Sequence, residues 1–541
     1  MHRNQSVNTH KFAMVPRADI PRSGFKIETT HKTTLDAGYL YPIYLTEILP
    51  GDSFNLKATI FARLATPIVP IMDNLYLETF FFFVPNRLVW SNWVKFMGEQ
   101  KSPGDTISYT IPQITSPTNG HARASIYDYF GIPCAGQIGL GNVISHSALP
   151  LRAYYLIWTE WFRDENLQAG GTLNIGNGPD TASFYNLLRR GKRHDYFTSC
   201  LPWVQKGTSV SLPLGTSATV KTAGSALVTG AHPALVFSQA ADGSAPAGNY
   251  LTGVNAAGTL ARTTGMAGET LNQVMYPNNL YADLSTATAA TINQIRQAFQ
   301  IQKLLERDAR GGTRYTELVK SHFGVISPDA RLQRPEYLGG GTTPISIREV
   351  PQTQSTEAGT TPQGNLAGVG TATAHGHGFT QSFTEHGHVI GLASIRADLT
   401  YQQGLRKLWS RKTRYDFYFP VFAMLGEQAV LNKEIYAKGD ANDDLVFGYQ
   451  ERWAEYRYQP SLTTSYMNSS ATAPVDVWHL AQKFTTLPVL NSSFIIDNPP
   501  IDRVIATTDI TGQQFIVDAF FKINAARPLP MYSVPGLVDH F

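Results

Sequence analysis

The stretch that decides the fold is residues 74–90, "NLYLETFFFFVPNRLVW", in which four consecutive phenylalanines interrupt an alternating pattern. Leu75, Leu77 and Thr79 alternate with other residues, as in a strand that buries one face. Phe80, Phe81, Phe82 and Phe83 then place large apolar side chains on both faces. Burial of each such side chain contributes on the order of 1.5–3 kcal/mol. We therefore expect a cover on the second face, from helices of the same chain or from a neighbouring copy.

Other segments at both ends of the chain also predict strands. Phe54, Leu56, Ala58 and Ile60 alternate with polar residues, which indicates a strand with one buried face. Prolines and an Asp-Asn pair mark a turn before the phenylalanine run. Further strands are predicted after residue 415 by "YDFYFPVFAMLG", "DLVFGYQERWAEYRYQ" and "QQFIVDAFFKINAARPLP". Strands at both ends favour a mainly β Greek-key sandwich with large insertions and pairing between the first and last segments.

Two segments between these strands predict helices. Residues 149–168 repeat apolar side chains at three- and four-residue steps, and Pro150 stands at the first helical turn. A second helix is expected at about 285–310 and ends at Gly311-Gly312. The aromatic residues of the first helix that we expect in the buried core or at an interface are Trp158, Trp161 and Phe162.

The length of 541 residues exceeds what one bare core usually supports, so we expect two domains or one domain with long insertions. Residues 216–270 are rich in Ala, Gly, Ser and Thr, which indicates an excursion that packs against copies of itself or forms a variable tip. A second Gly/Thr-rich loop is predicted at 355–380. The expected organisation is a basic extended arm (1–34), the first part of the main domain with a helical insertion (35–207), a variable insertion (208–285) and the remainder (286–541).

Composition narrows the functional class. The net charge of +3 is too small for a dedicated nucleic-acid binder, and 16% charged residues is low for a typical soluble domain. Two cysteines make no disulfide framework and fit a reducing compartment. The first residues lack the apolar core of a signal peptide, and no apolar run is long enough for membrane insertion.

Sequence signatures of catalysis are absent, so we predict neither an enzyme nor a cofactor. No nucleophile elbow, phosphate-binding loop or zinc-protease motif occurs. Cys134 and Cys200 lack a catalytic context and are interpreted as inert buried thiols. The best candidate ligands form two His-x-His pairs, which could meet a metal on facing strands of a hairpin or belong to a polar loop that binds nothing. These residues are His375, His377, His386 and His388.

Basic residues gather in the N-terminal arm, in "LRKLWSRKTRYDFYF" at 405–419 and in "RRGKRHDYF" at 189–197. Cations beside an aromatic ring suit single-stranded nucleic acid held without sequence preference. A solvated tail, a solvated face or local salt bridges are the alternatives. The candidates for contact with nucleic acid are Arg3, Lys11, Arg17, Arg22, Arg406, Lys407, Trp409, Arg411, Lys412 and Arg414.

From about residue 10 to residue 540 the chain resembles the major capsid protein of the gokushoviruses, small single-stranded-DNA bacteriophages of the Microviridae. The motifs that carry this resemblance, in order, are "FAMVPRADIPRSGF", "LETFFFFVPNRLVW", "LPLRAYYLIWTEWFRDENL", "KRHDYFTSCLPW", "SPDARLQRPEYLGG", "LRKLWSRKTRYDFYFPVFAMLGEQAVLNKEIYAKG" and "RPLPMYSVPGLVDH".

The resemblance implies an eight-stranded antiparallel jelly roll with long loops, of which sixty copies form a T=1 icosahedral shell around circular single-stranded DNA. It further implies that the 208–285 insertion gathers in threes into a protrusion that meets a host-surface receptor. The implied partners are further copies of the chain, packaged DNA, an internal scaffolding protein and a DNA-pilot protein. The implied location is the virion, after assembly in the host bacterial cytoplasm.

Two other functions fit a β-sandwich. A jelly-roll carbohydrate-binding module would present aromatic residues to sugars as a soluble monomer. A hydrolase would use the histidine loop as its site and would need a metal or paired carboxylates.

Overall fold

The computed structural model describes residues 21–171, 173–210, 292–312, 314–326, 333–356, 362–506 and 513–532, and short strand segments between 219 and 283. The chain divides into two compact units. The first comprises residues 1–204 and 309–541, and the second comprises residues 205–308. The predicted insertion at 208–285 falls within the second unit, and most of it lies outside the described residues.

The first unit is built on eight antiparallel strands in the order β1-β18-β3-β14-β13-β4-β15-β2. The first four face the last four across a common core, and pairing of β13 with β14 from Ser346 to Pro351 joins the two halves. This order is the jelly roll, and the predicted fold class is confirmed. The strands are β1 (Ser23–Leu35), β2 (Tyr41–Ile48), β3 (Ser53–Leu64), β4 (Leu75–Pro85), β13 (Glu336–Pro351), β14 (Leu366–Ser382), β15 (Gly387–Ala397) and β18 (Phe515–Arg527).

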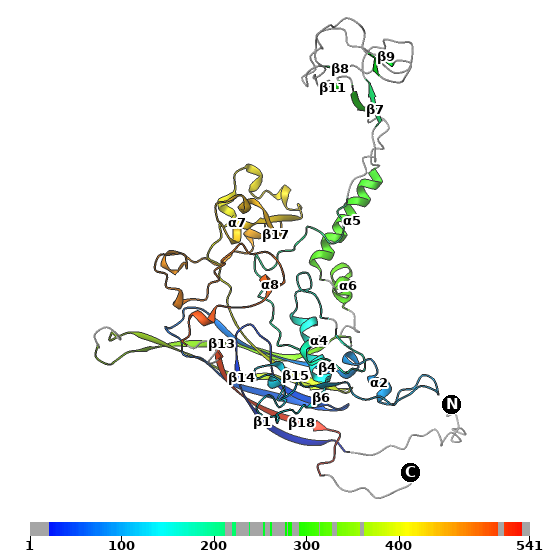
Figure 1. Cartoon of the computed structure of the whole chain (residues 1–541), viewed down its shortest axis with the longest axis vertical. Helices are drawn as coiled ribbons and strands as arrows, with labels where there is room; N and C mark the ends of the chain where they lie inside the picture. Colours follow the sequence, from blue (N-terminus) through cyan, green and yellow to red (C-terminus); the bar gives the residue numbers. More distant parts are fainter. Residues whose placement is uncertain are drawn as a thin grey trace, which may run out of the picture. The chain divides into compact units, whose positions relative to one another are not determined.

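The two ends of the described chain pair with each other. β1 runs antiparallel to β18, from Ser23 opposite Arg527 to Leu35 opposite Phe515. Figure 1 shows these strands in dark blue and red along one edge of the sandwich. The pairing predicted between first and last segments is therefore confirmed. The second part of the 1–34 segment is β1, and residues 1–20 lie outside the described residues.

The phenylalanine run lies in β4, which is covered on both faces. Phe81 and Phe83 point into the core between the two halves of the sandwich. There the ring of Phe81 lies 5.6 Å from that of Phe379, and the ring of Phe83 lies 4.7 Å from that of Phe383. This face is closed by the jelly roll alone.

The other face of β4 packs against a second core formed by inserted segments. The ring of Phe162 lies 5.2 Å from Phe80 and 5.9 Å from Phe82, and the ring of Trp161 lies 5.5 Å from Phe82. Phe82 is 1% exposed, whereas Trp161 remains 39% exposed. Of the two covers expected from the sequence, the chain's own helical insertion is the one observed.

Neighbouring glycines make room for the phenylalanine rings. Gly391 on β15 pairs with Phe81, and a Cβ at this glycine would lie 2.8 Å from the Phe81 ring. On β13, Gly340 pairs with Phe80, and a Cβ there would lie 2.0 Å from the carbonyl oxygen of Thr79. Only residues without side chains fit at these two positions.

The covering helix α4 (Leu149–Ile157) continues as a π-helical turn, Trp158–Phe162, so the helix predicted at 149–168 ends six residues early. Arg152 is fully buried and forms a two-bond ion pair with Asp180, with N–O distances of 2.6 and 2.8 Å. Arg152 Nη1 also donates to the carbonyl oxygens of Val89 and Gly176. These bonds satisfy a charge that would otherwise be costly to bury.

The remaining described elements are short except α5, which confirms the helix predicted near 285–310 and its end before Gly311. No helix among the described residues is long and apolar enough to cross a membrane. The helices are α1 (Asn86–Val89), α2 (Trp93–Phe96), α3 (Ile126–Tyr129), α5 (Ile292–Arg310), α6 (Tyr315–Phe323), α7 (Asn432–Ile435) and α8 (Ser492–Ile495). The short strands are β5 (Gln113–Thr115), β6 (Ser145–Ser147), β7 (Thr219–Thr222), β8 (Phe237–Ser238), β9 (Gly253–Val254), β10 (Leu260–Ala261), β11 (Tyr276–Pro277), β12 (Leu280–Asp283), β16 (Glu427–Leu431) and β17 (Val446–Glu451).

Two predictions from composition are wrong. Most of the loop predicted at 355–380 is strand β14, where Gly368, Gly370 and Ala372 alternate toward the interior. A Cβ at Gly370 would lie 2.9 Å from Leu64, so small residues are required by close packing and do not indicate a loop. The strand predicted from "YDFYFPVFAMLG" is a series of exposed turns, because its aromatic residues have no core to enter.

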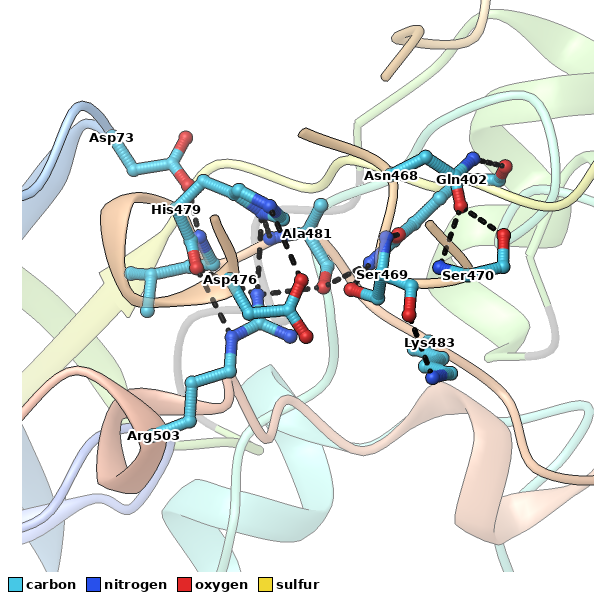
Figure 2. Close-up of polar contacts among 11 residues, drawn as sticks. Asp73, Gln402, Asn468, Ser469, Ser470, Asp476, His479, Ala481, Lys483 and Arg503 are labelled. Carbon is cyan, nitrogen blue, oxygen red and sulfur yellow. Dashed lines mark hydrogen bonds and ion pairs between the residues drawn. The ribbon is translucent and has the colours of Figure 1, made fainter. Parts of the chain in front are cut away.

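Between β17 and β18 the chain is held largely by side chains that bond to backbone groups (Figure 2). Gln402 accepts a hydrogen bond from the backbone N–H of Ser469 at 2.7 Å and donates to the carbonyl oxygen of Ala481 at 3.0 Å. Arg503 donates to the carbonyl oxygens of His479 and Ala481, at 2.6 and 3.0 Å. These bonds replace strand pairing in a long irregular segment.

Phe82→Ala should lower the free energy of unfolding by about 3–5 kcal/mol, because it empties a filled site under α4. Phe82→Asp should leave aggregated chain and no assembled particles, because the carboxylate would be buried without a partner. Urea unfolding of the unassembled protein measures the first effect. Phe520 on β18 is 37% exposed, so Phe520→Ala is the matched control and should lower the free energy of unfolding far less. Equal losses at the two sites would contradict the account.

A histidine pair beside the second core, in which His121 is buried and His146 is half-buried, predicts a dependence of stability on pH. Nε2 of His121 lies 3.1 Å from Nε2 of His146, and the His121 ring stacks on Tyr127 at 3.6 Å. Burial and the neighbouring His146 lower the pKa of His121 to about 4, and burial lowers the pKa of His146. The unfolded chain therefore takes up protons at higher pH than the folded chain.

The contribution of this pair to the free energy of unfolding should be fully present above pH 6.5, the ordinary histidine pKa. It should be lost as the pH drops toward 4. The free energy of urea unfolding, measured at several pH values, gives this slope. His121→Gln removes one of the titrating groups and should make the slope shallower. An unchanged slope would show that the pair does not control acid stability.

Candidate functional site

The most distinctive surface of the first unit is an exposed apolar segment, residues 405–425, which we call the 405–425 surface. Trp409 is 72% exposed, Tyr415 69%, Val421 86% and Met424 96%. Monomeric soluble proteins rarely expose so many large apolar side chains together, and such patches mark interaction sites. The further exposed members are Leu405, Leu408, Phe417, Tyr418, Phe419 and Leu425.

Internal hydrogen bonds give this surface a defined conformation. Asp416 accepts hydrogen bonds from the backbone N–H groups of Lys412 and Thr413, at 2.9 and 2.7 Å. These bonds lower the pKa of the Asp416 carboxyl. Trp453 Nε1 donates to the carbonyl oxygen of Phe422 at 2.9 Å. The exposed side chains are therefore presented by an ordered backbone.

Three of the basic candidates in this segment form hydrogen bonds or ion pairs with other residues of the same chain. Lys407 donates to Glu434 at 3.1 Å and to the carbonyl oxygen of Ala429 at 2.8 Å. Arg411 pairs with Glu455 at 3.2 Å, and its guanidinium lies 4.6 Å from the ring centre of Tyr456.

Arg406 donates to the carbonyl oxygen of Pro460 at 3.2 Å. With Lys407 and Arg411 it lines a cavity of about 270 Å³ bordered by Tyr456 and Tyr458. Local salt bridges and hydrogen bonds, one of the alternatives left open by the sequence, thus account for much of this basic cluster.

The other candidates in this segment face outward. Lys412 and Arg414 are exposed, and the Arg414 guanidinium lies 5.2 Å from the ring centre of Phe419. Trp409 has most of its ring accessible. These three side chains combine positive charge with aromatic surface and can meet a partner without rearrangement.

The predicted arm contributes one described candidate. Arg22 is exposed, and its guanidinium donates to Ser53 Oγ at 2.8 Å at the end of β3. Arg3, Lys11 and Arg17 lie outside the described residues.

The four candidate metal ligands are not brought together. His375 and His377 lie on β14, whereas His388 lies on β15, and these strands do not pair with each other. Both ring nitrogens of His377 are occupied by hydroxyl groups, of Thr79 at 2.9 Å and Thr343 at 3.0 Å. The predicted facing hairpin is therefore not formed.

His386 precedes β15, and its ring lies 5.8 Å from that of Trp93. Burial lowers the pKa of His388 to about 4, so this ring is neutral near pH 7. Among the described residues, no group of three or more His, Cys, Asp or Glu side chains is arranged to hold a metal ion.

Both cysteines are free and buried. Burial raises the pKa of Cys134 to about 11 and raises that of Cys200 as well. The reactive thiolate form is therefore disfavoured at both positions.

In the second unit, helix α5 exposes apolar side chains along its length. Ile292 is 70% exposed, Phe299 60% and Leu304 51%. Seven residues are close to two helical turns, so Ile292 and Phe299 share a face, whereas Leu304 lies on a different side of the helix. Exposed apolar side chains of this kind can mark an interaction site.

Sequence reasoning found the 405–425 segment but assigned its aromatic residues to a strand. It also left the segment 189–193 ambiguous, and here the structure buries Arg190 and Lys192 at 8% exposure each. The signal that was available is the partner carboxylate Glu78, which interrupts the apolar pattern of β4.

Comparison with known proteins shows the family to which the chain belongs. The family model of the capsid protein (F protein) matches residues 13–537. Capsid protein VP1 of Bdellovibrio phage phiMH2K is 48% identical over 538 residues, covering 99% of each chain.

Capsid protein VP1 of Chlamydia phage 1 is 43% identical over 602 residues, and that of Spiroplasma virus 4 is 37% identical over 553 residues. Each alignment covers 98% of both chains. The resemblance to gokushovirus capsid proteins is confirmed, and the carbohydrate-binding alternative is not favoured. The chain belongs to the capsid protein (F protein) family, and its role is that of a structural protein of the virion.

Proposed function

We propose that this protein is the major capsid protein of a small phage and that sixty copies close into a T=1 icosahedral shell around circular single-stranded DNA. Family membership over nearly the whole chain supports the proposal. The single structural observation that carries it is the ordered apolar 405–425 surface. When copies associate and bury this apolar surface, the free energy of the system falls.

Closed symmetry makes modest contacts sufficient. Each copy in a closed shell makes all its contacts at once, so assembly depends sharply on concentration. The proposal assigns the part of the 405–425 surface that carries Val421 and Met424 to a contact between copies, because the phenylalanine run is already covered within the chain. Val421 and Met424 are its most exposed apolar members, at 86% and 96%.

The 208–285 insertion is proposed to form a protrusion at the threefold axis and to meet a host-surface receptor. The exposed apolar side chains of α5, such as Phe299, support association of this region with its symmetry copies. Internal scaffolding protein and DNA-pilot protein are further proposed partners, and assembly is proposed to take place in the host bacterial cytoplasm. The support for these partners is family resemblance.

Packaged DNA is proposed to contact the outward-facing Trp409, Lys412 and Arg414, together with the N-terminal arm. Lysine and arginine neutralise phosphates, and an exposed indole ring stacks on a base. The number of such cations is small, so the contact is weak, salt-sensitive and independent of base sequence. Arg406, Lys407 and Arg411 are held by bonds to other groups of the chain and contribute to this surface through their charge.

Replacing Val421 and Met424 together by Asp should abolish shells and leave a folded, soluble chain, because charges would have to be buried at the contact. Sedimentation velocity and negative-stain electron microscopy measure assembly, and circular dichroism checks the fold. Val421→Ile with Met424→Leu keeps the surface apolar and should assemble. Normal shells from the double Asp variant would place the contact elsewhere.

Reversing two charges, Lys412→Glu with Arg414→Glu, should make filled particles release DNA at lower salt than wild type. Nuclease-protected DNA per particle, measured across a salt series, gives the effect. Lys412→Arg with Arg414→Lys preserves the charge and serves as the control. Identical retention by the reversed and control variants at every salt concentration would remove these residues from the DNA-facing set.

A further inference from the structure

The segment 189–193, "RRGKR", forms a second cationic site distinct from the 405–425 surface. Arg190 and Lys192 are 8% exposed, and Arg396 on β15 is 7% exposed. Burial of several cations in one place is costly unless each has an anionic or hydrogen-bonding partner. The acceptors around these cations therefore decide whether the site can bind a further anion.

Carboxylates satisfy part of this charge. Glu78 on β4 lies 2.5 Å from Arg190 and 2.9 Å from Arg193. Arg396 lies 3.8 Å from Glu78 and 3.8 Å from Asp497, which is longer than a hydrogen bond. Burial alone would raise the pKa of Glu78, but Arg190 and Arg396 lower it below the ordinary value. Glu78 is thus ionised and shared among several cations.

Beside this network is an open cavity of about 370 Å³ whose lining is strongly cationic. Arg163, Arg190, Lys192, Arg193 and Arg396 all border it, and His194 lies at its exposed side. Among the described residues that line the cavity, Asp164 is the one carboxylate. Glu78, Asp398 and Asp497 lie near the cations from outside the lining, and Arg193 pairs with Asp398 at 3.2 Å. The lining therefore holds five cationic side chains and one carboxylate.

Two arginines that line the cavity each carry a buried Nε–H with no acceptor among the described residues. Arg190 Nε is buried, and no described residue accepts its hydrogen bond. Arg163 Nε is also buried without an acceptor among the described residues. Arg163 Nη1 donates to the carbonyl oxygen of Gln168 at 2.7 Å. A buried N–H without an acceptor is rare in folded proteins.

The surroundings of Lys192 point the same way. Its ammonium donates to Gln482 Oε1 at 3.0 Å and lies 4.3 Å from the ring centre of Phe494. Burial lowers the pKa of Lys192 to about 8, and the charged groups that act on it, Asp497 and Asp195, raise it only partly. An additional anion in the cavity would stabilise the protonated amine.

We propose that this cavity is a binding site for a phosphate-class oxyanion, carried by a nucleic-acid backbone or present as free phosphate. Arg163, Arg190, Arg193 and Arg396 line one cavity, and a tetrahedral anion can accept hydrogen bonds from several guanidinium groups at once. A planar carboxylate offers two acceptor atoms and satisfies fewer of these donors. The site is independent of the DNA contact proposed for the 405–425 surface.

Isothermal titration calorimetry of the full chain, with inorganic phosphate and with acetate at constant ionic strength, tests the proposal. Phosphate should bind measurably more tightly than acetate. Arg163→Gln should weaken phosphate binding about tenfold or more, because it removes a charged donor. Arg63→Gln, at an exposed position on β3, is the matched control and should bind as wild type does. Arg193→Lys keeps the charge beside Glu78 but loses the planar fork, so it should weaken binding without unfolding the protein.

Proton uptake provides a second measurement. At pH 8, phosphate should raise the pKa of Lys192, so binding heats should differ between buffers of different ionisation enthalpy. Heats that do not depend on the buffer would place the anion away from Lys192 and overturn the assignment. Equal affinity for phosphate and acetate, or full affinity in Arg163→Gln, would overturn it too.

Competition with a short single-stranded oligothymidine identifies the source of the phosphate. Displacement of bound phosphate by the oligonucleotide assigns the site to a nucleic-acid backbone. Phosphate binding that the oligonucleotide does not displace assigns it to free phosphate. The DNA contact of Lys412 and Arg414 is tested separately by the salt series described above. Failure of one proposal therefore does not imply failure of the other.

Discussion

The structure depends on one constraint, which is that strand β4 must be covered on both faces. Its four phenylalanines project alternately into two cores, one between the halves of the jelly roll and one beneath α4. Gly391 and Gly340 on the neighbouring strands leave the space that this strand needs. The insertion that carries α4 is therefore part of the main fold. The buried Arg152–Asp180 pair holds this insertion by bonding to backbone groups that the apolar core cannot satisfy.

Because the phenylalanine run is satisfied within the chain, the surface left for association lies elsewhere. The 405–425 surface and helix α5 carry the large exposed apolar side chains that a lone folded chain leaves in water. A coat protein has to meet two demands at once. Its fold must be complete before assembly, so that copies do not aggregate through unfinished cores, and it must still retain apolar surface for its neighbours. Separate segments meet these two demands here.

Basic residues are likewise divided between two environments. In the 405–425 segment, Lys407 and Arg411 pair with carboxylates while Lys412 and Arg414 face outward. In the 189–193 segment, the cations converge on Glu78 and on a cavity beside it. A net charge of +3 conceals this arrangement, because the cavity collects cations whose counterions lie mostly outside its lining. Local placement of charge, more than total charge, decides where an anion can bind.

The β class, the strand Ser53–Leu64 and the two helices could be predicted from the sequence, because these follow from local periodicity and capping residues. The pairing of the chain ends was expected from the Greek-key arrangement that strands at both ends favour. Composition misled where packing overrides it: Gly370 and Ala372 indicated a loop, yet they lie in β14, where a larger side chain would clash. Tyr415 and Phe417 indicated a buried strand, yet they are exposed. Only the tertiary structure decided which cover β4 receives, that the four histidines stay apart, and which cations face a shared cavity. Each of these depends on contacts between residues far apart in the chain, and local sequence patterns do not encode those distances.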